Sequence, residues 1–131
     1  MWKAMSLIAG VLFAASPASA QSLLGQWTNC KGNAVVQVER CGNAYCGRVI
    51  KATAKAKAQA REAGTANLVG TRILTGLRPV GGGKYRGNAF IPKRNIRGTA
   101  TVRQLSPEVM EVQGCVVGGM LCDKEYWMRV G

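Results

Sequence analysis

The sequence of 131 residues contains no histidine and only one aspartate, Asp123. Serine–histidine triads, histidine zinc sites and paired-aspartate metal sites are therefore excluded by composition. After Ala20 only two serines remain, and no apolar run approaches the roughly 20 residues that cross a bilayer. Acid–base chemistry would depend on a few carboxylates, so we expect a protein that is not an enzyme and that uses no cofactor or metal.

The first 20 residues are organised like an export signal. Lys3 opens a short basic stretch, residues 5–15 are apolar, and Ala18-Ser19-Ala20 is a small-residue cleavage site. Cleavage after Ala20 leaves one domain, 21–131, whose net charge is +11, the +12 of the full chain less Lys3. The expected location is therefore the periplasm or the exterior. A domain of this size builds one core or one small cavity.

Short β segments separated by turn residues occupy most of the remaining chain. The clearest two-residue period lies in 96–105, where small or apolar residues alternate with arginine and threonine. The expected strands are 22–28, 34–41, 45–51, 69–77, 84–91, 96–105, 108–117 and 120–130, with Arg78-Pro79 ending the fourth. About eight strands at this spacing predict an all-β fold, a small antiparallel barrel, with a sandwich as the alternative.

Segment 51–63 is the exception, because it consists almost wholly of alanine and charged residues. These residues favour helix, yet the segment has no large apolar side chain that would dock a helix on the barrel. Two interpretations stay open. The segment is either a solvated, partly helical or mobile excursion over a barrel mouth, or a basic lid that meets an anionic partner.

Four of the five cysteines lie in two expected hairpins. A two-residue turn in each hairpin would place its cysteines directly opposite each other, where Cα atoms are about 4.5–5.5 Å apart and a disulfide can form. Such bonds persist in an exported protein. We therefore predict the disulfides Cys41–Cys46, across a turn at Asn43-Ala44, and Cys115–Cys122, across a turn at Gly118-Gly119.

A four-cysteine zinc site is the alternative to these disulfides. The six residues between Cys115 and Cys122 exceed the spacing of about two to four that zinc pairs usually have. Cys30 is left over, and without a histidine to activate it we expect a buried thiol or a link between two copies in a dimer.

Charge is strongly segregated along the chain. Between Arg48 and Arg103 there are 13 lysines and arginines against one acid, Glu62, whereas the net charge from Gln104 onward is −2. Neighbouring strands would present a basic flank suited to phosphate or carboxylate groups, although a positive surface also serves solubility alone. The residues expected to bind anions are Lys84, Arg86, Lys93, Arg94, Arg97 and Arg103.

The expected partner of this flank is an anionic component of the cell envelope, a membrane surface included. Nucleic acid is not expected, since Tyr85 and Phe90 alone in the basic half could stack on bases. Among the acids, Glu111 could face Asp123 or Glu125 across strands as a hydrolytic pair. A solvent-facing or salt-bridged edge is the favoured interpretation of these carboxylates.

An ordered set of short motifs resembles the bacterial domain-of-unknown-function 2147 family of small exported proteins. The motifs are Gly25-Gln26-Trp27, Cys41-Gly42, Cys46-Gly47-Arg48, the segment 73–77, Gly114-Cys115, Gly118-Gly119, Cys122 and Trp127-Met128-Arg129. The resemblance implies a lipocalin-like barrel. It also implies a structural cation–π contact between Trp27 and Arg129, and a core or plug position for Trp127.

Three functional hypotheses follow. The first is a non-enzymatic exported barrel that binds an anionic envelope component through its basic flank. The second, which the resemblance implies, is a lipocalin-like carrier of a small apolar or amphipathic ligand inside the barrel. The third is a structural or inhibitory partner of another envelope protein, with the acidic C-terminal hairpin or an exposed strand edge as its contact.

Overall fold

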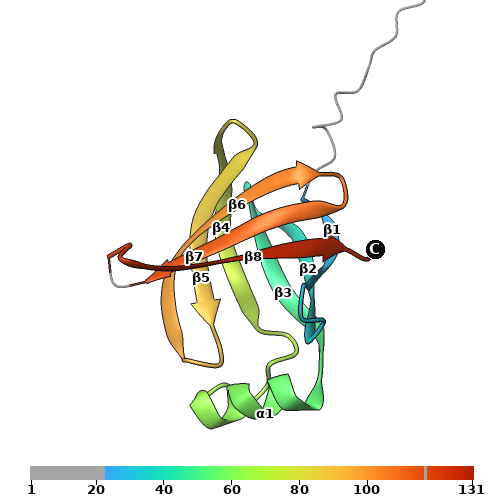
Figure 1. Cartoon of the computed structure of the whole chain (residues 1–131), viewed down its shortest axis with the longest axis vertical. Coiled ribbons are helices and arrows are strands. Elements are labelled where there is room, and N and C mark those ends of the chain that lie inside the picture. Colours follow the sequence, from blue (N-terminus) through green and yellow to red (C-terminus); the bar gives the residue numbers. More distant parts are fainter. Residues whose placement is uncertain (1–22, 117) are drawn as a thin grey trace, which may run out of the picture.

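The computed structural model describes residues 23–116 and 118–131, which form a closed antiparallel barrel with one helix at its end (Figure 1). The elements are β1 (Gly25–Asn29), β2 (Ala34–Cys41), β3 (Ala44–Ala52), α1 (Ala54–Ala63), β4 (Arg72–Gly81), β5 (Lys84–Ile91), β6 (Ile96–Ser106), β7 (Val109–Val116) and β8 (Leu121–Arg129). Each strand pairs with the next along the chain, and β1 pairs with β8. The predicted eight-stranded barrel is confirmed, and the sandwich is wrong. The export signal expected in residues 1–20 lies outside the described residues.

The barrel core is built by alternate residues of each strand. In β6, Ala100 and Val102 are fully buried inside, while Arg97 and Arg103 on the other face are exposed. This alternation is what a half-buried strand requires. The strand residues of the buried core cluster are Trp27, Val36, Val38, Val49, Leu74, Leu77, Ala100, Val102, Met110, Val112 and Trp127. The barrel closes through β1 and β8, which pair at the three positions Trp27–Arg129, Thr28–Met128 and Asn29–Trp127.

The fourth strand differs from its prediction at both ends. It was expected over 69–77 and ended by Arg78-Pro79, but β4 begins at Arg72 and continues through Pro79 to Gly81. Proline is tolerated where a ladder is irregular, because its missing N–H then breaks no regular bond. The register with β5 does shift on both sides of Pro79, between Thr75 and Arg78 and between Pro79 and Gly81.

The β2–β3 hairpin contains the predicted Cys41–Cys46 disulfide in a different register. The turn is Gly42-Asn43, not Asn43-Ala44, so Cys41 pairs with Ala44 and Cys46 pairs with Glu39. Gly42, at a φ of +70°, takes the first loop position, where a left-handed conformation suits a tight hairpin.

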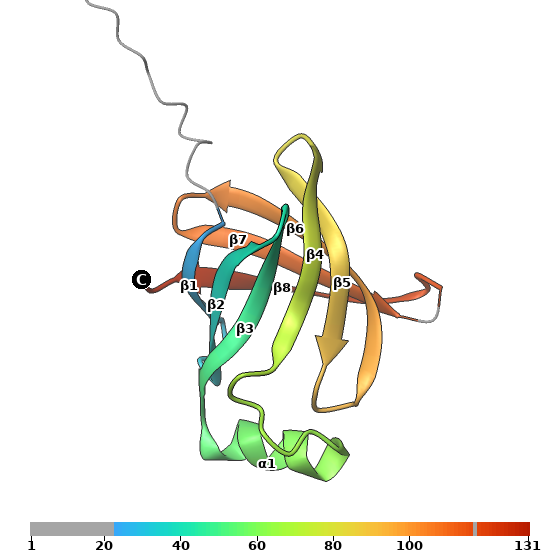
Figure 2. The same cartoon turned by 180° about the vertical axis from the view of Figure 1, so that it is seen from behind.

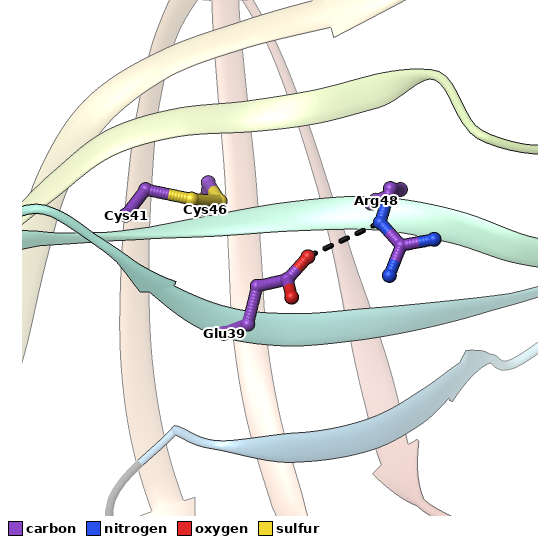
Figure 3. The surroundings of a disulfide bond; sticks show 4 residues. All are labelled: Glu39, Cys41, Cys46 and Arg48. Atoms are coloured by element: carbon purple, nitrogen blue, oxygen red, sulfur yellow. Dashed lines mark hydrogen bonds and ion pairs between the residues drawn. A yellow bond between two sulfur atoms is a disulfide. The ribbon is translucent and has the colours of Figure 1, made fainter.

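The disulfide therefore joins diagonal neighbours, whose Cα atoms are 5.9 Å apart. The ion pair from Arg48 Nε to Glu39 Oε1, 3.1 Å long, crosses the same hairpin (Figure 3).

The β7–β8 hairpin contains the second predicted disulfide. Cys115 and Cys122 are directly opposed, as expected, and their sulfurs are bonded. Because all four hairpin cysteines are in disulfides, the zinc alternative is wrong. Cys30 is free and exposed, which excludes the buried alternative; a dimer through Cys30 stays a prediction. The two disulfides indicate an oxidising, extracytoplasmic compartment.

Candidate functional site

Helix α1 covers one end of the barrel (Figures 1 and 2). It begins after Thr53, whose Oγ1 accepts a hydrogen bond of 3.2 Å from the N–H of Ala56. It ends at Gly64, which adopts the left-handed conformation at a φ of +118°. The expected excursion is thus a helix. It is also too short and polar to cross a membrane, and no other helix occurs in the described part of the chain.

The helix docks through small side chains rather than large ones. Ala60 is buried and Ala56 packs against the barrel core. Leu68, in the loop that follows the helix, is also buried and supplies the large apolar contact that the helix lacks. This loop is tied to β3 by hydrogen bonds of 2.7 Å from Gly70 N–H to Val49 O and 2.9 Å from Val49 N–H to Thr71 O.

A cavity of about 260 Å³, the helix cavity, lies between α1 and the barrel interior. Its apolar lining combines barrel core residues with alanines of the helix. These lining residues are Ala34, Val49, Ala56, Ala60, Leu68, Ile73, Leu74, Ala89, Phe90, Ile91, Pro92, Val112 and Trp127. An apolar cavity with a few convergent polar groups is the usual form of a small-molecule site.

Four charged side chains also line the helix cavity: Lys31, Lys93, Asp123 and Glu125. The carboxylate of Glu125 is fixed by a 2.7 Å hydrogen bond from Trp127 Nε1. Among the described residues, none of the four forms an ion pair, since the pairs found are Arg48–Glu39 and Lys124–Glu111. The lining therefore offers both signs of charge to a ligand.

The hydrolytic pair considered from the sequence is wrong. Glu111 is paired with Tyr126 in the β7–β8 register. Asp123 and Glu125 are three residues and one residue before Tyr126 in β8, so their side chains point to the face opposite that of Tyr126 and Glu111. Residues that alternate along a strand point to opposite faces of the sheet. Glu111 lies outside, where its Oε2 is 3.9 Å from Lys124 Nζ, and the other two line the cavity. The salt-bridged alternative holds for Glu111.

A second depression, the arginine groove, adjoins the helix cavity. Its volume is about 440 Å³, and it lies between the end of the β5–β6 hairpin and β7–β8. It is lined by Ile91, Arg94, Ile96, Arg97, Gly114, Val116, Leu121, Cys122 and Asp123. Ile91, Gly114 and Asp123 line the helix cavity as well, so the two spaces are neighbours.

The six predicted anion-binding residues fall into two groups. All six are exposed. Because β5 runs towards α1, residues at its start lie at the barrel end away from the helix, and residues after its end lie near the helix (Figure 1). Lys84, Arg86 and Arg103 lie at the end away from the helix, where Lys84 is directly opposite Arg103 and Arg86 is opposite Arg78 of β4. The other three, Lys93, Arg94 and Arg97, lie beside the helix cavity and the arginine groove.

The barrel end away from α1 contains the contact that the resemblance implied. Arg129 Cζ lies 4.4 Å from the ring centre of the fully buried Trp27. The same guanidinium donates to Pro107 O at 2.8 Å and to Leu24 O at 2.6 Å. Trp27 Nε1 donates to Leu23 O at 2.9 Å. These contacts hold the Arg129 side chain against Trp27 and the β6–β7 turn.

Comparison with known proteins fits this architecture. The model of a family described as an uncharacterized protein conserved in bacteria (DUF2147) matches residues 25–129. The chain belongs to this family. No curated protein matches the sequence. Among solved structures, protein HP1028 from Helicobacter pylori, described as belonging to the lipocalin family, is similar, with a TM-score of 0.65. At 16% identity over 84% of each chain, this likeness shows the lipocalin-like fold alone.

Part of the site in this DUF2147 barrel was missed from the sequence. Trp127 was expected in the core or plug; it is buried there, yet it also lines the helix cavity. For Asp123 and Glu125 the sequence predicts a pairing with Glu111, or a solvent-facing edge of an acidic hairpin, but no place in a cavity. The missed signal is the two-residue spacing in β8, which places both carboxylates on the same face as Trp127.

Proposed function

We propose that this DUF2147 barrel is a non-enzymatic, extracytoplasmic carrier of a small amphipathic molecule. The observation that carries the proposal is the helix cavity, whose apolar lining continues the barrel core and whose charged groups have no ion-pair partner among the described residues. Burial of an apolar ligand in such a cavity contributes about 25 cal/mol per Å² of apolar surface. The charged lining then orients the polar end of the ligand.

The test uses nonanol as a neutral amphipathic probe and tryptophan fluorescence as the readout. Of the two tryptophans among the described residues, Trp127 lines the cavity and Trp27 is fully buried at the other end of the barrel. A change on binding that Trp127→Phe removes therefore reports on the cavity. Ala60→Leu fills the cavity from the helix side, and we expect it to weaken binding by about tenfold. Ala54→Leu, at an exposed position of α1, is the matched control.

Circular dichroism establishes that both variants fold. Saturable binding by the wild type that Ala60→Leu weakens by about tenfold and Ala54→Leu keeps would support the carrier. No binding by a folded wild type, or equal binding by both variants, would contradict it. Protein taken from its native compartment adds an independent arm, since an extra mass seen only under native conditions gives the size of the ligand.

A second candidate function is binding of an anionic envelope polymer at the barrel end away from α1. The residues that would bind it are Lys84, Arg86 and Arg103, together with Arg78 of β4. Like charges directly opposite each other in a sheet are destabilising, yet Arg78 faces Arg86. Lys84 also faces Arg103, whose neighbour on the other side is Glu111 of β7. An anionic partner would offset this repulsion. Lipopolysaccharide binding measured across a salt series tests the candidate: affinity should fall steeply with salt and with Arg78→Gln/Arg86→Gln, and a salt-independent affinity would contradict it.

A further inference from the structure

The helix cavity and the arginine groove differ in chemistry but share a boundary. The helix cavity is lined by alanines of α1 on one side and by barrel core residues on the other. The arginine groove is lined by Arg94 and Arg97 together with apolar residues. Ile91, Gly114 and Asp123 line both spaces. A molecule with an apolar chain and a polar head could therefore extend from one space into the other.

The two arginines are presented to the groove by neighbouring structure. Arg97 stacks over Phe90, with its Cζ 4.4 Å from the ring centre, and Phe90 also lines the helix cavity. Arg94 lies in the β5–β6 turn, where its N–H donates to Ile91 O at 3.2 Å. Neither guanidinium forms an ion pair with a carboxylate among the described residues. Their planar donors suit a carboxylate or a phosphate.

The balance of charge around both spaces favours an anion. Lysines and arginines contribute four of the charged residues that line them, and Asp123 and Glu125 contribute two. Glu125 already accepts a hydrogen bond from Trp127, and Asp123 is exposed. A carboxylate or phosphate at Arg94 and Arg97 would meet a positive local field, which Asp123 weakens.

We propose that the ligand is an anionic amphiphile with a single aliphatic chain. The chain occupies the helix cavity and the anionic head lies in the arginine groove, on Arg94 and Arg97. This proposal rests on the proposed carrier function and specifies its ligand class. Dividing the cavity volume of about 260 Å³ by the ~30 Å³ that one water molecule takes up in the liquid gives about nine groups of that size, so a nine-carbon chain sets the length of the probes.

The experiment compares probes that have one chain and different heads: nonanoate, nonyl phosphate, nonanol and nonylamine. Binding of each is measured by calorimetry with the full barrel and with Arg94→Gln/Arg97→Gln. The matched control is Arg78→Gln/Arg86→Gln, which removes the same charge from the far end of β4 and β5. Circular dichroism establishes that both double variants are folded.

We expect the anionic probes to bind about tenfold more tightly than nonanol, and Arg94→Gln/Arg97→Gln to abolish that difference while leaving nonanol within about twofold. The control variant should keep the preference. The relative affinities of nonanoate and nonyl phosphate then distinguish a carboxylate from a phosphate ligand. Asp123→Asn should strengthen binding of the anionic probes, because it removes the opposing charge.

Equal binding of nonanol and nonanoate, or a preference for nonylamine, would overturn the anionic head while leaving the carrier in place. An anionic preference that survives Arg94→Gln/Arg97→Gln but is lost in Arg78→Gln/Arg86→Gln would also overturn it, since the head would then lie at the other end. Failure of all four probes to bind the wild type would contradict the carrier function itself.

Discussion

Arg129 is the residue on which the far end of the barrel depends most. Its guanidinium reaches three groups at once: the Trp27 ring and the carbonyls of Pro107 and Leu24. Hydrogen bonds from a charged donor contribute about 1.5–3 kcal/mol each. We expect Arg129→Ala to lower the free energy of unfolding by about 2–4 kcal/mol in urea titrations.

The conservative variant separates geometry from charge. Arg129→Lys keeps the positive charge but lacks the planar fork that spans two carbonyls, so it should restore only part of the loss. Arg94→Ala, at an exposed position of the β5–β6 turn, is the control and should change stability by less than about 0.5 kcal/mol. A wild-type urea midpoint for Arg129→Ala would rule out this role.

Tyr85 is the residue that links stability to alkaline pH. Burial, together with the neighbouring Tyr45, raises the pKa of the Tyr85 phenol above its ordinary 10.0. The two rings meet edge to face, 5.6 Å apart between centres. The folded state therefore holds this proton more tightly than the unfolded state. The resulting stability is fully present below pH 10.0 and is lost as pH rises through the folded pKa.

The measurement is urea stability as a function of pH on the alkaline side. Tyr85→Phe should flatten the alkaline decline relative to the wild type, because the titrating group is gone. Tyr126→Phe, at an exposed position on the outer face, is the control and should retain the wild-type profile. An unchanged slope in Tyr85→Phe would show that this phenol is not linked to folding.

At the scale of elements, the sequence predicted strands well where alternation was strict and less well at turns. The expected 84–91 matches β5, and the expected 96–105 is one residue shorter than β6. The β2–β3 turn was placed one residue late, because a cross-strand register was assumed for Cys41 and Cys46 that a diagonal disulfide does not need.

The sequence predicts α1 only as one of two alternatives for segment 51–63, and the reason is physical. Alanine and lysine indicate helix, but the residue that completes its docking, Leu68, lies outside the segment. The cavity beneath it could not be predicted, since it depends on how closely Ala56 and Ala60 approach the barrel, a distance that no local pattern contains.

The two disulfides should contribute similar stability but differ in function. They close short loops, with sequence separations of 5 and 7, so removal of each should cost about 2 kcal/mol. Cys122 also lines the arginine groove, whereas Cys41 and Cys46 line neither space. We expect Cys115→Ala/Cys122→Ala to weaken nonanoate binding, and Cys41→Ala/Cys46→Ala to leave it unchanged at a matched loss of stability. Urea titration and calorimetry on the same samples measure both effects, and equal losses of binding would refute the distinction.

On the scale of the whole molecule, the two ends of the barrel differ in structure. At one end the buried Trp27 packs against the guanidinium of Arg129. The other end is covered by α1, which meets the barrel through Ala56 and Ala60, and a cavity lies beneath it. The basic residues, which form one block along the sequence, are divided between these ends by the direction of β5. Charge along the chain therefore indicated an anionic partner without indicating at which end it would bind.

Closure of so small a barrel also requires strands to approach more closely than side chains allow. A Cβ added at Gly98 would lie 2.0 Å from Cys115 O of the next strand, and one at Gly87 would lie 2.4 Å from Thr75 O of the preceding strand. Both clashes are with backbone, which cannot rotate away. At Gly114 the nearest atom, Ala89 Cβ, would be 3.9 Å away, so this position has room.

These distances predict opposite outcomes for one chemical change. Gly98→Ala and Gly87→Ala should each lower the free energy of unfolding by about 2–3 kcal/mol, because the sheet must separate locally to admit the methyl group. Gly114→Ala should be neutral or stabilising by up to about 1 kcal/mol, since alanine restricts the unfolded chain at no steric cost. Urea titration of the three variants measures the effect. Equal stability of all three would show that close strand approach at Gly87 and Gly98 is not what closes the barrel, whereas the expected split places the constraint at the β4–β5 and β6–β7 contacts.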